Sequence, residues 1–285
     1  MKTLDTLIPD IYEVLDGLNS DKGIDISEEL MADFLFNMRE ALEGWSTPHL
    51  QSKTIRMSNV GRPLRRVWYD MKDSSEEKKD MHPSNFIKFL YGHLLEQIAI
   101  LLIKLSGHEV SGMQKEVEVD GIKGHMDCKI DGEVVDIKTA SNFSFKKFSE
   151  GTLVDDDPFG YLAQLAGYEE AEGTDDGGFF AINKESGEIC LFRPGNLSKP
   201  NIRTKISTIK ESLEVDTPPS ICYPPIPEGK KGNLKLAAGC VYCPHKAKCW
   251  ADSNNGRGLR AFKYSNGVKY FTRVISTPKV LEISL

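Results

Sequence analysis

Apolar residues in the first hundred positions recur at helical spacing, and the spacing becomes strand-like from about Glu109 onward. In the upstream region they fall three and four positions apart, as on one face of an amphipathic helix. Ser27 precedes the second of these runs, with Glu28 and Glu29 behind it, which is a typical helix start. The pattern predicts helices over residues 4–18, 26–45, 63–71 and 86–105.

Alternation of apolar and polar residues with a period of two predicts a sheet in the middle of the chain. Asp120-Gly121 and Asp131-Gly132 indicate two-residue hairpin turns, because a type I′ turn needs positive φ at both central positions. We therefore expect three antiparallel strands in a meander. The expected strands are 113–119, 122–130, 133–140, 177–183 and 189–192, with helices at 158–171 and 203–215. This order predicts an α/β fold, a mixed sheet flanked by helices in an α+β arrangement.

The second turn sets a register that brings charged residues together. Counting outward from Asp131-Gly132 places Asp127 directly across from Asp136, and Lys138 lies on the same face as Asp136. Like charges directly opposite one another destabilise a sheet, and a cation between them would remove that cost. The hairpin therefore predicts a site with two acids and one ammonium.

These residue types match the requirements of metal-dependent phosphodiester hydrolysis. Mg²⁺ and Mn²⁺ bind carboxylate oxygen and can activate a coordinated water. We expect Asp127 and Asp136 to hold such an ion, with the carbonyl oxygen of Ile137 as a further ligand. Lys138 would orient or deprotonate the attacking water, or stabilise charge in the transition state.

The Asp136-Ile137-Lys138 triplet with Asp127 upstream resembles the PD-(D/E)XK nuclease superfamily, and within it the RecB-like exonuclease branch. The resemblance implies a restriction-endonuclease-like core with a Mg²⁺- or Mn²⁺-dependent deoxyribonuclease activity. It also implies that Glu96, in the helical run 86–105, is a metal ligand.

A later helix carries a second motif of this branch. Gln164 and Tyr168 match its Gln-x-x-x-Tyr pattern, and residues four apart share one helical face. The resemblance implies that these two side chains contact DNA phosphate or position Lys138.

Two further segments resemble phage-encoded exonucleases related to the CRISPR-adaptation nucleases. One is the Arg-rich segment, residues 57–69, and the other is a cysteine cluster at residues 239–250. The resemblance therefore spans about residues 57–250. It implies a DNA exonuclease of phage-type recombination, repair or degradation, which acts on single- or double-stranded DNA ends. Arg62, Arg65 and Arg66 are then candidate phosphate contacts.

Cys240, Cys243 and Cys249 are spaced closely enough to predict a structural metal site. Relatives with a 4Fe–4S cluster use a fourth cysteine in the Arg-rich segment, and this chain has none there. Tetrahedral Zn²⁺ accepts both cysteine and histidine, so Cys222 or His245 could complete the site. Zinc and an iron–sulfur cluster both remain alternatives.

Composition narrows the class of protein. The formal net charge is -6, which argues against a passive nucleic-acid coating protein, while residues 230–273 hold ten basic residues and a single acid. We expect no membrane-spanning run and no signal pattern, hence a soluble, cytoplasmic protein, in a host cell if the gene is of phage origin. The expected organisation is an N-terminal helical segment (1–50), the nuclease core (51–215), and a Cys-rich basic C-terminal segment packed on the core (216–285).

Two alternatives share these motifs. A structure-specific endonuclease could use the same core, and a non-catalytic DNA-end-binding recombination module could retain the acids without using them. Taken singly, Glu96 fits an exposed helix residue and Asp136 with Lys138 fits a solvated strand face; only their combination indicates a nuclease. The sequence leaves open whether the chain forms a homo-oligomer or binds a recombination or replication protein.

Overall fold

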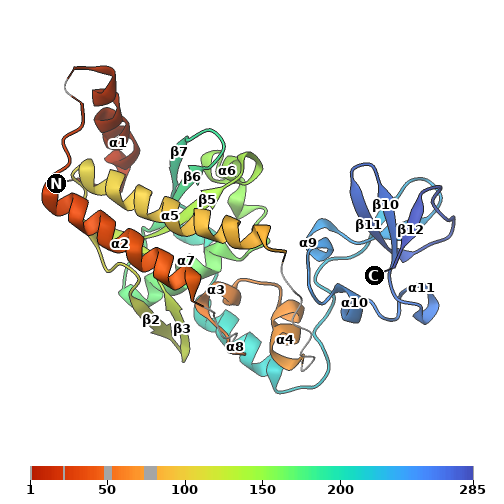
Figure 1. Ribbon diagram of the computed structural model, residues 1–285. Coiled ribbons are helices and arrows are strands. Elements are labelled where there is room, and N and C mark those ends of the chain that lie inside the picture. Colours follow the sequence, from red (N-terminus) through yellow and green to blue (C-terminus); the bar gives the residue numbers. More distant parts are fainter. Residues whose placement is uncertain (1, 22, 48–52, 74–81, 285) are drawn as a thin grey trace. The chain divides into compact units, whose positions relative to one another are not determined.

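The computed structural model describes residues 2–21, 23–47, 53–73 and 82–284 (Figure 1). The chain divides into two compact units. The first unit comprises Met1–Gly61 and Ser75–Ser207, and the second comprises Arg62–Ser74 and Thr208–Leu285. The predicted start of the nuclease core, at residue 51, lies outside the described residues.

A mixed five-stranded sheet of order β1-β4-β5-β6-β7 organises the first unit. All neighbouring strands are antiparallel except β5 and β6, which are parallel with Val135 opposite Gly178. Helices lie between these two strands in sequence, as a parallel connection requires. The strands are β1 (Val110–Ser111), β4 (Cys128–Ile130), β5 (Glu133–Ala140), β6 (Gly178–Asn183) and β7 (Ile189–Phe192). The predicted α/β fold with a mixed sheet is confirmed.

The predicted three-strand meander is wrong in one respect. The expected strand 122–130 is broken, so that β2 (Glu116–Val119) and β3 (Ile122–His125) form a separate two-stranded sheet. The break falls at Met126 and Asp127, whose backbone groups form hydrogen bonds with Lys115 and Gln114. The Gln114 N–H donates to the carbonyl oxygen of Asp127 at 3.0 Å, and the Met126 side chain is fully buried. Burial of Met126 and this tertiary hydrogen bond outweigh the local strand pattern.

The longer helices of the first unit match predicted ranges, whereas the helices Met57–Val60 and Asn142–Ser149 were not predicted. Ser27 caps α2 as expected, because its hydroxyl accepts a hydrogen bond from the Leu30 N–H at 3.2 Å. The helices are α1 (Leu7–Asp16), α2 (Glu28–Ser46), α3 (Met57–Val60), α5 (Ser84–Leu105), α6 (Asn142–Ser149), α7 (Tyr161–Glu172) and α8 (Ile202–Leu213), which continues into the second unit. Short 3-10 turns occur at Leu4–Thr6, Gly17–Asn19, Thr152–Val154 and Asn196–Ser198.

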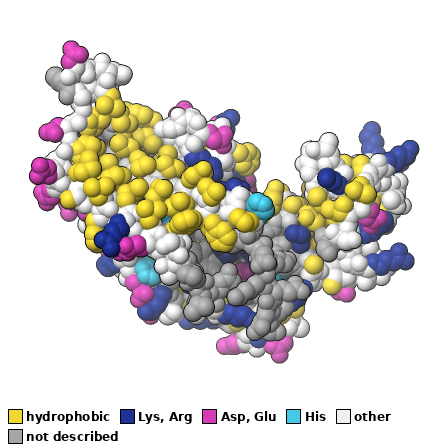
Figure 2. Space-filling view, viewed as in Figure 1, with side chains coloured by type: hydrophobic (Ala, Val, Ile, Leu, Met, Phe, Trp, Pro, Cys, Tyr) yellow, Lys and Arg dark blue, Asp and Glu magenta, His cyan; other side chains and the backbone are white. Residues whose placement is uncertain are grey.

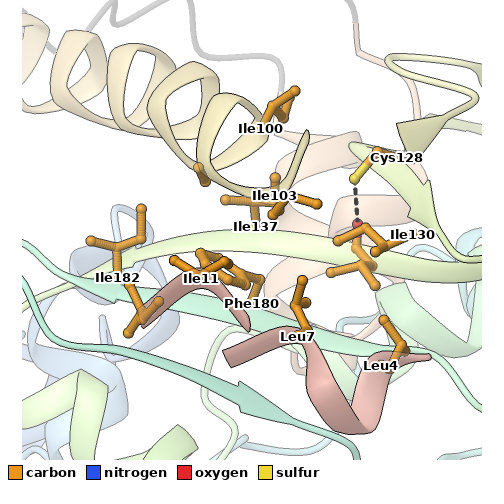
Figure 3. Close-up of a cluster of buried hydrophobic side chains, with 13 residues drawn as sticks. Leu4, Leu7, Ile11, Ile100, Ile103, Cys128, Ile130, Ile137, Phe180 and Ile182 are labelled. Carbon is orange, nitrogen blue, oxygen red and sulfur yellow. Dashed lines mark hydrogen bonds between the residues drawn. The ribbon is translucent and has the colours of Figure 1, made fainter. Parts of the chain in front are cut away.

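The hydrophobic core of the first unit lies where α5 and α1 pack against the sheet (Figure 3). Ile100 and Ile103 of α5 and Ile11 of α1 meet Ile137 and Phe180 from the central strands. Each fully buried side chain of this size contributes roughly 1.5–3 kcal/mol. The packing fixes β5, and therefore the strand that carries the predicted site.

Helix α5 is also long and apolar enough, by length and composition, to cross a membrane, with a mean hydropathy of 1.6 over its best window. This differs from the sequence-based expectation, because the few charges of the helix are widely spaced. Core helices of soluble proteins have the same composition, and Ala99, Ile100 and Ile103 of α5 are buried in the core described above.

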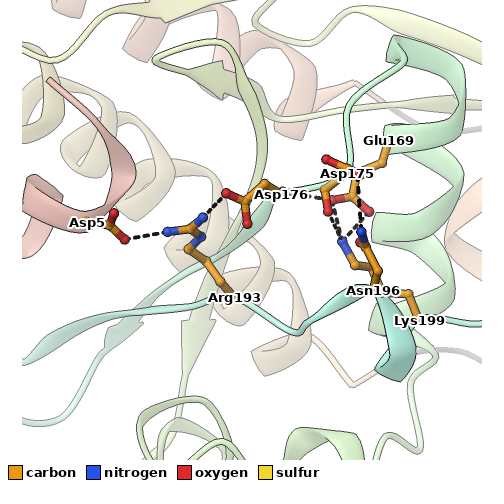
Figure 4. A network of polar contacts seen from close by, with 8 residues as sticks. Asp5, Glu169, Asp175, Asp176, Arg193, Asn196 and Lys199 are labelled. Carbon is orange, nitrogen blue, oxygen red and sulfur yellow. Dashed lines mark hydrogen bonds and ion pairs between the residues drawn. The ribbon is translucent and has the colours of Figure 1, made fainter. Parts of the chain in front are cut away.

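Ion pairs attach the end of the sheet to the helices around it (Figure 4). Arg193, after β7, contacts Asp5 at 2.5 Å and also pairs with Asp176. The Lys199 ammonium lies 2.7 Å from a Glu169 carboxylate oxygen, and both side chains are 5% exposed. Burial raises the pKa of Glu169, and Lys199 opposes this shift. These contacts connect the N-terminal residues to β7 and α7.

The second unit contains its own five-stranded antiparallel sheet, of order β12-β10-β11-β9-β8. Sequence analysis predicted no strands here. The Phe262 and Phe271 rings, on neighbouring strands, pack edge to face with their centroids 5.2 Å apart. The strands are β8 (Ile226–Glu228), β9 (Asn233–Lys235), β10 (Arg260–Tyr264), β11 (Gly267–Arg273) and β12 (Leu281–Ile283).

The other part of the second unit is the Arg-rich helix α4 (Leu64–Lys72) with the cysteine-bearing helices. The Trp68 indole N–H donates to the carbonyl oxygen of Val215 at 3.1 Å, 147 positions along the chain. The short helices are α9 (Ala238–Val241), α10 (Lys246–Cys249) and α11 (Ser253–Gly256). The second unit is thus built from α4, early in the sequence, and from residues about 150 positions later.

Candidate active site

The hairpin between β4 and β5 has the predicted turn and register. Asp131 and Gly132 have φ of 50° and 94°, as a type I′ turn requires. Cys128 is opposite Val135, and Ile130 is opposite Glu133. The ladder ends at Cys128, so Asp127 lies just before β4 rather than in a strand pair with Asp136.

Asp136 is a buried carboxylate on β5, with 1% exposure. The Lys138 ammonium forms an ion pair with its Oδ2, and Oδ1 has no hydrogen-bond partner among the described residues. Lys138 also lies over the ring of Tyr161, with its Nζ 4.9 Å from the centroid. A buried carboxylate with free lone pairs is costly unless further positive charge or donors reach it.

Asp127 turns its carboxylate toward β5 from the break between β3 and β4. Its Oδ2 accepts a hydrogen bond from the Ile137 N–H at 2.7 Å, between Asp136 and Lys138 in sequence. Burial raises the pKa of Asp127 well above its usual range, and the charge of Asp136 raises it further. Lys138 opposes this shift. The two acids predicted to share a site do interact electrostatically.

Glu96 reaches the same group from α5. Burial raises its pKa and the charge of Asp136 adds to the shift, while Gln114 and Lys138 lower it. The Gln114 amide donates to Glu96 Oε1 at 2.8 Å. For Lys138, burial lowers the pKa, but Asp136 and Asp127 more than offset this and the net shift is upward. Three acids and one ammonium therefore share a poorly solvated region.

The acids are suitable ligands for a divalent cation by donor type, and Asp136 Oδ1 is free to accept a bond, but the three carboxylates are not arranged as a complete coordination site. Within the described ranges, no three His, Cys, Asp or Glu side chains are grouped so that they could hold a metal ion as they stand. Asp127 and Glu96 accept hydrogen bonds, and Lys138 contacts Asp136. A cation at Asp136 would compete with that lysine.

Gln164 and Tyr168 lie together on α7, as predicted. The Gln164 amide donates to the Tyr168 hydroxyl at 3.0 Å. Burial raises the pKa of Tyr168 to about 12, and the charges of Asp136 and Asp127 also raise it. The ring is 2% exposed and packs against Gly124 of β3, where an added Cβ would lie 2.8 Å from Tyr168 Cε1. Tyr168 is therefore held rigidly, with its hydroxyl directed to Gln164.

The three predicted arginine contacts lie in the second unit and have protein partners there. Arg65 donates to Cys249 Sγ at 3.1 Å and to the carbonyl oxygen of Pro219. Arg62 and Arg66 lie 3.8 and 4.0 Å from Asp70. Arg65 is thus part of the cysteine region, whereas Arg62 and Arg66 each lie at ion-pair distance from Asp70.

Four cysteines of the second unit influence one another. Burial raises the pKa of Cys240 to about 11, and Cys222, Cys249 and Cys243 raise it further. Burial likewise raises the pKa of Cys222, with Cys249 and Cys243 adding to the shift. His245 has other partners, since its Nε2 lies 2.7 Å from Asp70 and its ring stacks on Tyr69. His245 is therefore already paired, and among the described residues the cysteines are not grouped so that they could hold a metal ion as they stand.

Sequence reasoning missed two side chains of the site, Tyr161 and Gln114. Tyr161 begins α7 and lies over Lys138. Gln114 has a φ of 51°, and it contacts Glu96 because of the break at Asp127. Neither residue belongs to a recognisable motif, so no signal in the sequence could have found them.

Comparison with known proteins yields structural similarities of low TM-score. No protein-family model matches the chain, and no curated protein matches it. The chain is similar to the crystal structure of SSO0001 (17% identity, TM-score 0.40), over 66% of this chain and 88% of that one. It is also similar to an alkaline exonuclease, LHK-Exo from Laribacter hongkongensis (14% identity, TM-score 0.40), over 60% of this chain and 92% of that one. A structure of LHK-Exo in complex with dAMP matches 57% of this chain and 88% of that one, with the same identity and TM-score.

Proposed function

We propose that this protein is a Mg²⁺- or Mn²⁺-dependent DNA exonuclease. The observation that carries the proposal is the buried Asp136, whose Oδ2 is paired with Lys138 and whose Oδ1 has no hydrogen-bond partner among the described residues. A structural ion pair of this kind would leave lone pairs unsatisfied in the interior, which is unfavourable. A carboxylate that binds a metal during turnover requires such free lone pairs.

Glu96, Asp127 and Asp136 would hold the ion, with the Ile137 carbonyl as a further ligand. The ion would polarise the scissile phosphate and lower the pKa of a bound water. Raised carboxyl pKa values at Glu96 and Asp127 support this assignment, because a nearby dication would favour the ionised forms that burial disfavours.

The remaining side chains of the proposed site would position the water and the substrate or supply positive charge. Lys138 is held over Tyr161 and beside Asp136, so its ammonium stays within the group of acids and can orient the attacking water. Gln164 and Tyr168 form a hydrogen-bonded pair that would support the substrate phosphate or Lys138. Arg62, Arg65 and Arg66 remain proposed phosphate contacts of the second unit.

The test is hydrolysis of end-labelled linear DNA and of covalently closed circular DNA with Mg²⁺, Mn²⁺ or EDTA. We expect metal-dependent release of nucleotides from linear DNA only. Lys138→Ala should lower the rate by about 10²–10⁴-fold. Lys184→Ala, at an exposed position after β6, is the matched control and should keep wild-type activity.

Each alternative has its own outcome. Cleavage of the circle would assign a structure-specific endonuclease. DNA binding without hydrolysis in any metal would assign a non-catalytic end-binding module. Undiminished activity of Lys138→Ala would remove the proposed role of that lysine.

We further propose that Cys222, Cys240, Cys243 and Cys249 bind a structural metal. Burial makes the free thiolates of Cys222 and Cys240 unfavourable, and a cation would reverse that cost. The Arg65 N–H directed at Cys249 Sγ would stabilise a ligated thiolate. Metal and sulfide analysis of the purified protein separates zinc from an iron–sulfur cluster. Cys222→Ser should lose the metal, and Cys190→Ser, on β7 in the first unit, should retain it.

A further inference from the structure

Helices α2 and α5 lie side by side and antiparallel in the first unit. The Trp45 indole N–H donates to the carbonyl oxygen of Phe86 at 2.9 Å, near one end of the pair. Near the other end, the Lys104 ammonium lies 2.5 Å from Asp33. No residue of α2 is fully buried, whereas the second half of α5 packs into the core. The α2–α5 pair therefore has one side on the protein and another side open.

The open side carries apolar residues at matching positions of the two helices. In α2 they are Met31, Leu35 and Leu42, and in α5 they are Ile87, Tyr91 and Ile98. In each helix these residues occupy positions i, i+4 and i+11. Position i+7 is a half-buried residue, Met38 in α2 and Leu94 in α5. Alternating steps of four and three are the seam spacing of helices that pack on other helices. We call these six exposed residues the helical seam.

The helical seam is exposed to an extent unusual for a core-forming stripe. Leu35 is 59% exposed, Ile87 is 52% and Tyr91 is 51%. Figure 2 shows hydrophobic side chains gathered in one broad area over these helices. With roughly half of each large side chain exposed, the six residues present about 500 Å² of apolar surface.

That area matches what a stable dimer needs. A standard interface buries about 800 Å² on each partner, of which a little over half is apolar. We propose that the helical seam is the contact surface for a second copy of this chain. Two copies related by a twofold axis would place two helix pairs together as a four-helix layer. The inference does not depend on the proposed nuclease activity.

The charges around the seam favour another protein chain over a lipid surface. The exposed charges of α2 are four glutamates (Glu28, Glu29, Glu40 and Glu43) and one arginine (Arg39), and α5 exposes Lys88, whereas helices that lie on membranes are typically rich in Lys and Arg beside the apolar face. The seam positions themselves include no charged residue in either helix. An apolar seam beside charges of both signs, with glutamates in excess, suits a helical protein partner and disfavours an anionic bilayer.

Sedimentation velocity of the full-length protein over a wide concentration range tests the proposal. We expect the wild type to sediment at twice the mass of one chain. Leu35→Glu and Tyr91→Glu should each weaken association by roughly a hundredfold or more, because each would bury an unpaired carboxylate at the contact. Leu197→Glu, which makes the same change at a fully exposed leucine of the first unit, should leave the dimer intact.

Two results of these sedimentation experiments would contradict the proposed dimer. A single-chain mass at the highest concentration would overturn the proposal, and so would a dimer that survives both glutamate variants. Co-flotation of the wild type with phosphatidylcholine vesicles, lost in Tyr91→Glu, would assign the helical seam to a membrane and would also overturn it. Circular dichroism melts of the variants confirm that they fold.

Discussion

The Lys138 ammonium forms an ion pair with Oδ2 of Asp136, two residues away on β5. Side chains two apart on a strand share a face, so the backbone itself brings this pair together. A divalent cation at Asp136 would replace the Lys138 ammonium as the positive partner of that carboxylate. Metal binding and the position of Lys138 are therefore coupled.

Asp127→Asn should raise the melting temperature of the metal-free protein at neutral pH. Burial and Asp136 raise the folded-state pKa of Asp127. A carboxyl with a raised folded-state pKa reduces stability above its unfolded-state pKa, and the reduction grows as pH rises toward the folded-state value. Asparagine removes this cost and still offers an oxygen to the Ile137 N–H. Thermal melts in EDTA should show a gain that shrinks in acid; a loss of stability at neutral pH would contradict the prediction.

Metal affinity should increase with pH. Glu96 and Asp127, whose pKa values are both raised by burial, must lose protons before they bind a cation. Calorimetric titration with Mn²⁺ in buffers of different ionisation enthalpy should reveal proton release on binding. The Glu96→Gln variant should bind Mn²⁺ more weakly than the wild type and release fewer protons on binding. Binding that is independent of pH would argue that these acids are already ionised.

Tyr161→Leu should slow hydrolysis by roughly threefold to thirtyfold, while Tyr161→Phe should stay close to wild type. The ring lies 4.9 Å from Lys138 Nζ, and a cation–π contact is worth about 0.5–2 kcal/mol. The effect should appear in kcat, since the ring positions the lysine rather than the substrate. Equal losses in both variants would point instead to the hydroxyl group.

Gly124→Ala should destabilise the protein by about 1–3 kcal/mol, because a Cβ there would lie 2.6 Å from Met57 Cβ and 2.8 Å from Tyr168 Cε1. The control is Gly44→Ala in α2, where no atom lies within 4 Å of the new Cβ. That change should be neutral or stabilising by up to about 1 kcal/mol. Denaturant unfolding of both variants makes the comparison; similar stabilities would show that the Tyr168 ring can move.

The sequence predicted those features that depend on neighbouring residues. The turn at Asp131-Gly132 and the register from Cys128 opposite Val135 follow from local chemistry alone. The N-cap at Ser27 is local in the same way. These elements supply Asp136 and Lys138 in the arrangement that was predicted.

What escaped prediction depends on residues distant in sequence. The break at Asp127 arises because its carbonyl oxygen binds the Gln114 N–H, and no periodicity in the chain signals that contact. The sheet of the second unit consists of short strands in a segment whose charge and cysteines masked its alternation. The pairing of His245 with Asp70 likewise joins residues 175 positions apart, and nothing near either residue in the sequence signals it.

The completion of the second unit by distant segments constrains how the protein can fold during synthesis. Trp68 finds its hydrogen-bond acceptor, Val215, only after 147 further positions have been translated. At ordinary rates of translation that interval is roughly ten to thirty seconds. Throughout it the nascent chain has to carry the α4 segment unassembled, so chaperone binding is expected there first.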